Sequence, residues 1–396
     1  MPQTRAIKIA VLTVAAALAM FGLSSPAQKN PAEPRFHAVD IGHGITLHYV
    51  EEGKGVPLIF VHGSLSDASY WADQIGPFSQ RYRAIAYSRR YNYPNINPAR
   101  PGYSAVVDSD DLAAFIGALH LGKVVVIGHS YGALTALFLA ARHPEMVRAL
   151  VLAEPPAVSL LADIHGDEGE RGKALFDDIQ QRMVRPMQQA YRKGDREEGI
   201  RVFMAYVFND PRAWEKMSQS SRDQTLRDAH QWDVMMTSGT LFPTITPQAV
   251  QSISAPVLIL IGAKSYPFLG VIGRELARLL PKSRTVVFSD AGHQMWLQHP
   301  EECRNDVEKF LAEQLGQVGG QLGREMEHHV KVANLEHEGD LLYFTWPRRA
   351  LLALGNRPHD LAEAARCRSG GTRLLHPGLG WRGLGGNLGE GRLSAG

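Results

Sequence analysis

The sequence is short of three features that would each point to a class of protein. Only two of its 396 residues are cysteines, and they form no CxxC pair or Cys/His cluster with the spacing of a zinc site. The 42 basic and 40 acidic residues nearly cancel, so no overall charge draws the protein to nucleic acid. No P-loop is present, and no dinucleotide-binding glycine motif follows a strand and opens a helix, so we predict no metal or cofactor.

The sequence also lacks an apolar run long enough to cross a membrane. Residues 9–23 form a mostly apolar run of 15 residues, whereas a membrane-spanning helix needs about 20. This run follows two basic residues and precedes Ser25 and Ala27, the small residues that a signal peptidase reads. We therefore predict a signal peptide over residues 1–27 and a periplasmic or secreted protein with no stable membrane anchor after cleavage.

Glycine is unevenly distributed, with 15 of the 38 glycines in residues 319–396. The same segment contains many arginines and shows neither the period of a strand nor that of a helix. Because each glycine costs backbone entropy in an ordered element, we expect residues 319–396 to be a disordered tail. Cys367 lies in this tail, and the sequence alone does not decide whether it pairs with Cys303.

Between these two ends, short apolar strands alternate with amphipathic helices. Continuous apolar runs, rather than alternating ones, are typical of parallel strands that helices cover on both faces. The region closes with an amphipathic helix over residues 300–315. This pattern predicts an α/β protein with a mostly parallel sheet. The clearest strands are residues 57–61, 83–87, 123–128, 149–153, 256–262 and 284–288, preceded by a hairpin over 36–50.

Residues 155–250 interrupt this alternation. They include helical segments at 172–191 and 197–208 but no convincing strand, and they lie between two strands of the predicted sheet. Ligands of open α/β sheets bind in the crevice outside the carboxyl ends of the strands. We therefore predict that residues 155–250 form a helical cap over that crevice.

The chemistry is concentrated in the pentapeptide Gly128-His129-Ser130-Tyr131-Gly132, which has the form GxSxG. It directly follows the strand residues Val124–Ile127 and opens a helix from Ala133, as a nucleophile elbow requires. Small residues are needed at both ends because Ser130 must sit on a tight, strained turn with its hydroxyl exposed. We predict that Ser130 is the nucleophile, and that His129 points away beneath it, where it packs and forms hydrogen bonds.

A serine hydroxyl is a weak nucleophile and needs a general base. The sequence has 16 histidines, so residue type alone does not select one. His293 lies in the loop after the last predicted strand and before the closing helix, in Ser289-Asp-Ala-Gly-His293. This position predicts that His293 is the base.

Together with Phe60-Val-His-Gly-Ser64, these motifs resemble the α/β-hydrolase superfamily over residues 35–316. The resemblance implies a mostly parallel, eight-stranded sheet with helices on both faces and a helical cap inserted after the sixth strand. It also implies an oxyanion hole formed by the backbone N–H groups of Ser64 and Tyr131. The expected domains are a core of residues 28–154 plus 251–318, a cap of residues 155–250 and a tail of residues 319–396.

The catalytic acid departs from the usual pattern of this superfamily, which has GxxD after the strand that here is 256–261. This sequence has Ser265 at that place, and because serine cannot stabilise an imidazolium as a carboxylate does, we expect Ser265→Ala to matter little. Some members, haloalkane dehalogenases among them, place the acid after the preceding strand, where this chain has Glu154. We predict that Glu154 is the acid. The carboxylates judged weaker are Asp163 and Asp167 in the cap and Asp290, which is too near His293 in sequence.

A second departure is the segment Tyr87–Pro94, where the superfamily often has DxRGxGxS. Arg90 corresponds to the arginine of that pattern, but Ser88 replaces its aspartate and the glycines are missing. We interpret Arg90 as a residue that braces the loop, with a clamp on a substrate carboxylate as the alternative.

A serine at the elbow favours acyl transfer over the aspartate-based chemistry of the dehalogenases and epoxide hydrolases that resemble this family. We predict a hydrolase of carboxylic esters of small to medium apolar molecules, working through an acyl-enzyme on Ser130. An amidase, a lactonase or a cofactor-free perhydrolase would use the same residues. A non-catalytic binding protein on a hydrolase scaffold is a third reading. The cap also contains aromatic and methionine residues that at helical spacing are more often core than pocket, and if some of them line the site, the site is apolar. They are Phe203, Tyr206, Phe208, Trp214, Trp232, Met235, Met236 and Phe242.

Overall fold

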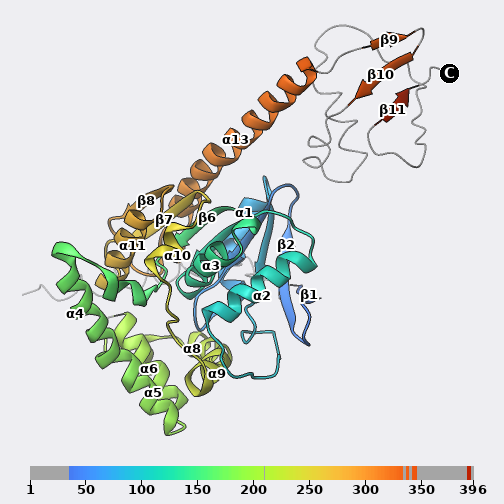
Figure 1. Ribbon diagram of the computed structural model, residues 1–396. Coiled ribbons are helices and arrows are strands. Elements are labelled where there is room, and N and C mark those ends of the chain that lie inside the picture. Colours follow the sequence, from blue (N-terminus) through green and yellow to red (C-terminus); the bar gives the residue numbers. More distant parts are fainter. Residues whose placement is uncertain (1–34, 209, 333–335, 339–340, 346–389, 394–396) are drawn as a thin grey trace, which may run out of the picture. The chain divides into compact units, whose positions relative to one another are not determined.

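A computed structural model describes the chain from residue 35 onward, apart from residues 209, 333–335, 339–340, 346–389 and 394–396 (Figure 1). The predicted signal peptide and Cys367 lie outside the described residues, so export stays a prediction. The chain divides into two compact units, Met1–Glu308 and Lys309–Gly396. In the part of the chain that the structure describes, no helix has both the length and the hydropathy to span a bilayer.

The first unit is built on one sheet with the strand order β1-β2-β4-β3-β5-β6-β7-β8. β1 and β2 pair antiparallel, as do β2 and β4, and every other neighbouring pair is parallel. The prediction of an eight-stranded, mostly parallel sheet is confirmed. The strands are β1 (His37–Asp40), β2 (Thr46–Glu52), β3 (Pro57–Val61), β4 (Arg83–Tyr87), β5 (Val124–His129), β6 (Val147–Ala153), β7 (Val257–Gly262) and β8 (Ser283–Phe288).

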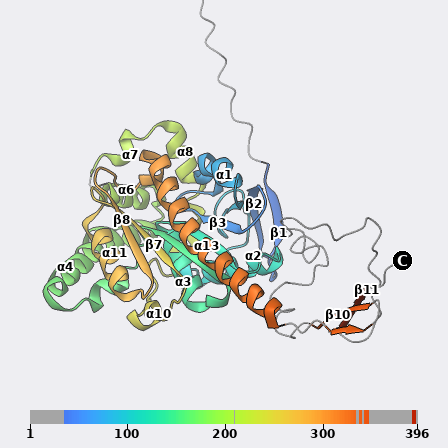
Figure 2. The same ribbon diagram turned by 90° about the horizontal axis from the view of Figure 1, so that it is seen from above.

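Helices cover both faces of this sheet, which explains the continuous apolar strands. All residues of β5 and β7 are buried, whereas burial alternates along the edge strand β8. Phe60 of β3 contacts Phe78 of helix α1 (Ala72–Ser79) on one face. On the other face, Tyr87 of β4 stacks on Phe115 of α2 (Ala105–Ala118). Figure 2 shows α3 (Tyr131–Arg142), α10 (Pro247–Gln251) and α11 (Pro267–Leu279) on the same side as α2.

Residues 155–250, hereafter the cap, join β6 to β7. Apart from residue 209, which is not described, they contain only helices and loops. Figure 1 shows these helices, in green and yellow-green, gathered at one end of the sheet. They include α4 (Gly169–Ile179), the π-helix η5 (Gln180–Val184), α5 (Arg185–Arg192), α6 (Arg196–Val207), α7 (Ala213–Lys216), α8 (Gln219–Arg227) and α9 (His230–Ser238).

The closing helix is longer than the sequence pattern suggests. Helix α13 spans Pro300–Val332, so the end predicted near residue 315 is wrong. The sequence carries a helical pattern there, because apolar residues recur at every fourth position from Val318 to Val330, although the stretch contains three glycines that each cost a helix about 1 kcal/mol. The expected tail also contains a small antiparallel sheet of β9 (Glu336–Glu338), β10 (Leu341–Thr345) and β11 (Glu390–Leu393).

Candidate active site

Ser130 occupies a strained turn between β5 and α3. Its backbone has φ 53° and ψ −123°, a left-handed conformation that is rare for a residue with a side chain. A β-carbon added at Gly132 would lie 2.2 Å from the carbonyl oxygen of Val61, and one at Gly128 would lie 2.5 Å from the α-carbon of Ala133. The strand, turn and helix therefore pack so closely that only glycine fits on either side of the serine.

Ser130 lines a small cavity together with Ser64, Tyr131 and His293. The cavity volume is about 30 Å³, which is room for about two water molecules. No lysine, arginine, aspartate or glutamate is among the described residues that line it. Of the eight aromatic and methionine residues singled out in the cap, Phe203, Trp232 and Phe242 line this cavity and the other five do not. The remaining lining residues are Pro156, Met183, Val207, Leu241, Phe268 and Leu269.

Glu154 and His293 form a direct hydrogen bond. The Nδ1 atom of His293 lies 2.6 Å from Oε2 of Glu154, whose side chain is fully buried. Because an ionised carboxylate only accepts hydrogen bonds, Nδ1 of His293 carries the proton and Nε2 is left as an acceptor. Glu154 directly follows β6 and has a positive φ of 51°, a second strained residue at this site.

Ser265 does not replace the acid but supports it. Its hydroxyl donates a 2.7 Å hydrogen bond to Oε2 of Glu154, and the N–H of Gly262 donates a 2.8 Å bond to Oε1. The two positions meet because β6 and β7 are parallel neighbours, so their carboxyl ends lie side by side. The expectation that Ser265 has little influence is therefore revised, because its loss leaves the buried carboxylate with one donor fewer.

The alternative carboxylates lie elsewhere or are not described. Asp290 is exposed and faces His299, with 3.5 Å between its Oδ1 and the Nε2 of that histidine. Asp163 is exposed in the cap. The side chain of Asp167 lies outside the described residues. Among the described carboxylates weighed for this role, Glu154 is the one bonded to His293.

His129 holds the loop that carries His293. Its Nε2–H donates a 2.8 Å hydrogen bond to the backbone carbonyl of His293, and its ring stacks on that of Tyr70 at 5.1 Å. Burial, together with the nearby His293, lowers the pKa of His129 to about 3. His129 is therefore neutral at ordinary pH, in the packing and hydrogen-bonding role predicted for it.

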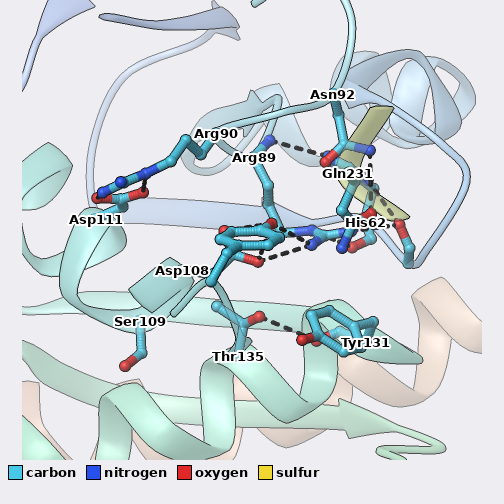
Figure 3. Close-up of polar contacts among 12 residues, drawn as sticks. His62, Arg89, Arg90, Asn92, Asp108, Ser109, Asp111, Tyr131, Thr135 and Gln231 are labelled. Carbon is cyan, nitrogen blue, oxygen red and sulfur yellow. Dashed lines mark hydrogen bonds and ion pairs between the residues drawn. The ribbon is translucent and has the colours of Figure 1, made fainter. Parts of the chain in front are cut away.

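Two arginines brace the loop after β4: Arg90, as interpreted from the sequence, and Arg89, which the sequence pattern did not single out. Arg89 is fully buried, and its Nη1 and Nη2 donate 2.8 Å bonds to Asp108 and to the carbonyl of Gly63. Arg90 instead forms an ion pair with Asp111. Figure 3 shows the two side chains directed to different partners. The spacing of the sequence motif selects Arg90 and does not reveal Arg89, because spacing does not show which of two neighbouring arginines is fully buried.

A parallel sheet with a serine elbow after β5, a histidine after β8 and a buried glutamate after β6 defines an α/β hydrolase. The described residues contain no group of three His, Cys, Asp or Glu side chains that could hold a metal ion. The model of the α/β hydrolase fold family matches residues 56–300. The chain belongs to this family.

Two similar curated proteins have substrates in their names. One is a 2-(acetamidomethylene)succinate hydrolase of Mesorhizobium japonicum, 27% identical over 281 residues, which are 69% of this chain and 94% of that protein. The other is a 2-hydroxy-6-oxo-6-(2'-aminophenyl)hexa-2,4-dienoic acid hydrolase of Metapseudomonas resinovorans, 26% identical over 287 residues, 68% of this chain and 88% of that protein.

Solved structures share the fold at lower identity. The enol-lactonase of Burkholderia xenovorans LB400 matches with a TM-score of 0.53 and 20% identity over 70% of this chain and 100% of that one. The carboxylesterase CesB of Bacillus subtilis matches with a TM-score of 0.54 and 20% identity over 72% of this chain and 93% of that one. These likenesses concern the fold.

The low pKa of His129 predicts a loss of stability in acid. The unfolded chain binds a proton at this histidine below about pH 6.5 and the folded chain does not until about pH 3, so the free energy of unfolding falls as the pH is lowered between these values. The contribution of this one group is about 1.4 kcal/mol per pH unit. We measure the free energy of unfolding by urea at pH 6.5, 5.5 and 4.5. In His129→Gln we expect this free energy to depend on pH less steeply than in the wild type, by this amount. Parallel slopes in the two proteins would contradict the assignment.

Proposed function

We propose that this protein is an exported serine hydrolase that cleaves carboxylic esters of small to medium, apolar molecules. The observation that carries the proposal is the 2.6 Å hydrogen bond from His293 to the buried Glu154, beside the cavity that Ser130 lines. A histidine held by a carboxylate next to a strained serine is the arrangement that activates a hydroxyl for acyl transfer. Export rests on the signal-like pattern of residues 1–27.

In the acylation step, Oγ of Ser130 attacks the ester carbonyl carbon while Nε2 of His293 takes the hydroxyl proton. The negative charge moves to the carbonyl oxygen, where the backbone N–H groups of Ser64 and Tyr131 are the proposed donors. Tyr131 begins helix α3, so the positive end of the helix dipole adds to this stabilisation. The intermediate collapses when the bond to the alcohol breaks and His293 returns the proton to the departing oxygen.

In the deacylation step, water replaces the alcohol as the nucleophile. His293 takes a proton from the water as its oxygen attacks the acyl carbon, and then donates that proton to Oγ of Ser130 as the acid product leaves. Glu154 stays ionised in both steps and stabilises the imidazolium. The bonds from Gly262 and Ser265 keep this carboxylate oriented in its buried site.

The cavity wall favours uncharged substrates. A carboxylate placed there would lose its water and find no cationic side chain among the described lining residues. The names of the two curated relatives both contain carboxylic acids, so this chain differs from them in its proposed substrate class. A volume of about 30 Å³ also does not admit an ester, so the proposed activity requires residues that line the cavity to move when the substrate enters.

The nucleophile assignment is tested with a fluorophosphonate probe, which forms a covalent bond with activated serines. We expect labelling of the wild type and none of Ser130→Ala, because the probe needs the serine oxygen. Melting temperatures of both proteins serve as the folding control. Labelling that persists in Ser130→Ala would remove Ser130 from its role.

The acid is tested by comparing Glu154→Gln with Ser265→Ala. Glutamine leaves the imidazolium without a negative partner, so we expect kcat for p-nitrophenyl butyrate to fall by about 100-fold or more. Ser265→Ala removes one hydrogen bond from a carboxylate that remains, and we expect a fall of about tenfold or less. A larger loss in Ser265→Ala than in Glu154→Gln would contradict the assignment.

Substrate charge is tested with a matched pair of esters, p-nitrophenyl butyrate and the p-nitrophenyl monoester of succinic acid. The second compound adds one carboxylate to an acyl chain of similar length. We expect kcat/KM to be at least about 100-fold higher for the butyrate, because the uncharged cavity does not compensate the desolvated carboxylate. Equal rates, or faster turnover of amides and lactones than of the butyrate, would overturn the proposed substrate class.

A further inference from the structure

The peptide between Gly63 and Ser64 is held from its carbonyl side. Its oxygen accepts a 2.8 Å hydrogen bond from Nη2 of Arg89 and a 2.9 Å bond from Nδ1 of His62. The same peptide carries the N–H of Ser64, which is a donor of the proposed oxyanion hole. A peptide group is planar and trans, so fixing its oxygen also fixes the direction of its N–H on the opposite side. Hydrogen bonds to the oxygen also polarise the N–H and make it a stronger donor.

Arg89 is a buried cation whose donors are all committed. Its Nε donates to the carbonyl of His62 at 3.2 Å, and Nη1 is paired with Asp108, the carboxylate that balances its charge. Burial opposes the charge, but Asp108 and Tyr103 prevail and raise the pKa of Arg89. The guanidinium also lies 5.0 Å from the ring centre of Tyr131, the residue that supplies the other proposed oxyanion donor. Arg89 therefore binds the peptide that carries one proposed oxyanion donor and contacts the side chain of the residue that carries the other.

One acceptor of Arg89 comes from the cap. The Oε1 atom of Gln231, in helix α9, accepts a 3.0 Å bond from Nη2 of Arg89, the nitrogen that also holds the carbonyl of Gly63. It accepts a second bond, of 3.2 Å, from Asn92 on the core side. Figure 3 shows Gln231 reaching this group from across the cap boundary.

The amide nitrogen at the other end of Gln231 costs stability rather than adding to it. The side chain is fully buried, and among the described residues its Nε2 has no hydrogen-bond partner. A buried donor without a partner costs stability, and an apolar residue would avoid that cost. A buried polar atom without a partner in a native protein calls for a specific explanation, and a role in a functional site is one kind.

We propose that Gln231 is a positioning residue that couples the seating of the cap to the oxyanion hole. When the cap is closed, Gln231 holds Arg89 against the Gly63–Ser64 peptide and directs the N–H of Ser64 at the reacting carbonyl. When the cap opens, Arg89 loses this acceptor and the peptide is held less firmly. The closed cap thus completes the site that stabilises the transition state. This inference rests on the proposed function, because it assigns a role within the same acyl transfer.

The test compares three variants of the full chain. Gln231→Met keeps the length of the side chain but removes the acceptor, and Gln231→Glu keeps an acceptor oxygen. Arg227→Met is the matched control, because Arg227 joins the cap to Asp67 and to the ring of Tyr93 and has no contact with Arg89 in the described structure. For each protein, kcat and KM are measured with p-nitrophenyl butyrate. The inhibition constant of an alkyl trifluoromethyl ketone is measured as well, because its serine adduct carries the oxyanion.

We expect Gln231→Met to lower kcat about tenfold and to raise the inhibition constant of the ketone by the same factor. KM should stay within about twofold of the wild-type value. In Gln231→Glu and Arg227→Met, kcat and the inhibition constant of the ketone should stay within about threefold of the wild-type values. If Gln231 only docked the cap, Gln231→Met would raise KM alone, or Arg227→Met would lower kcat as much as Gln231→Met does. Should Gln231→Met fail to fold, as judged by its melting temperature, Gln231→Ala removes the same acceptor without adding bulk and is read in the same way.

Three results would overturn the coupling. They are an unchanged kcat and ketone affinity in Gln231→Met, a rise in KM alone, and an equal loss of kcat in Arg227→Met. Each of them requires an active wild type whose Ser130 is labelled by the fluorophosphonate probe. A wild type that turns over no ester and takes no label overturns the proposed function itself, so the two failures are distinguished.

Discussion

The buried carboxylate of Glu154 is the constraint on which the rest of the site depends. A charge without water needs partners on every oxygen, and here they come from three segments of the chain, Gly262, Ser265 and His293. These partners fix the end of β7, the loop after it and the loop after β8 around one point. The histidine is therefore held at the edge of the sheet where the strained turn of Ser130 lies.

A second buried charge organises the other side of the cavity. Arg89 binds the carbonyls of His62 and Gly63 from the core side, and Asp108 neutralises it. The two charged groups lie outside the cavity wall, whose described residues are uncharged. The cavity interior therefore stays apolar. Outside its wall, Arg89 holds the Gly63–Ser64 peptide and Glu154 holds His293.

Much of the fold followed from local patterns. Continuous apolar strands require cover on both faces, and the glycines at 128 and 132 are needed wherever a strand turns tightly into a helix. Local patterns predicted less well where a helix ends and which of two neighbouring residues is buried. The helix expected to end near residue 315 continues to Val332, and the loop after β4 buries Arg89 rather than Arg90. Periodicity records which residues are apolar, but it does not record which of two adjacent cations is buried.

The sequence by itself determined how strands and helices alternate along the chain. It also determined the position of Ser130 on its turn and that of His293 after the last strand. Each of these depends on neighbours within a few residues. Only the tertiary structure decided that Ser265 donates to Glu154 from 111 residues away, and that Gln231 of the cap meets Arg89 of the core across 142 residues. Such contacts depend on which strands are adjacent and on where the cap lies. A pattern within a few residues carries no information on contacts between residues so far apart in the sequence.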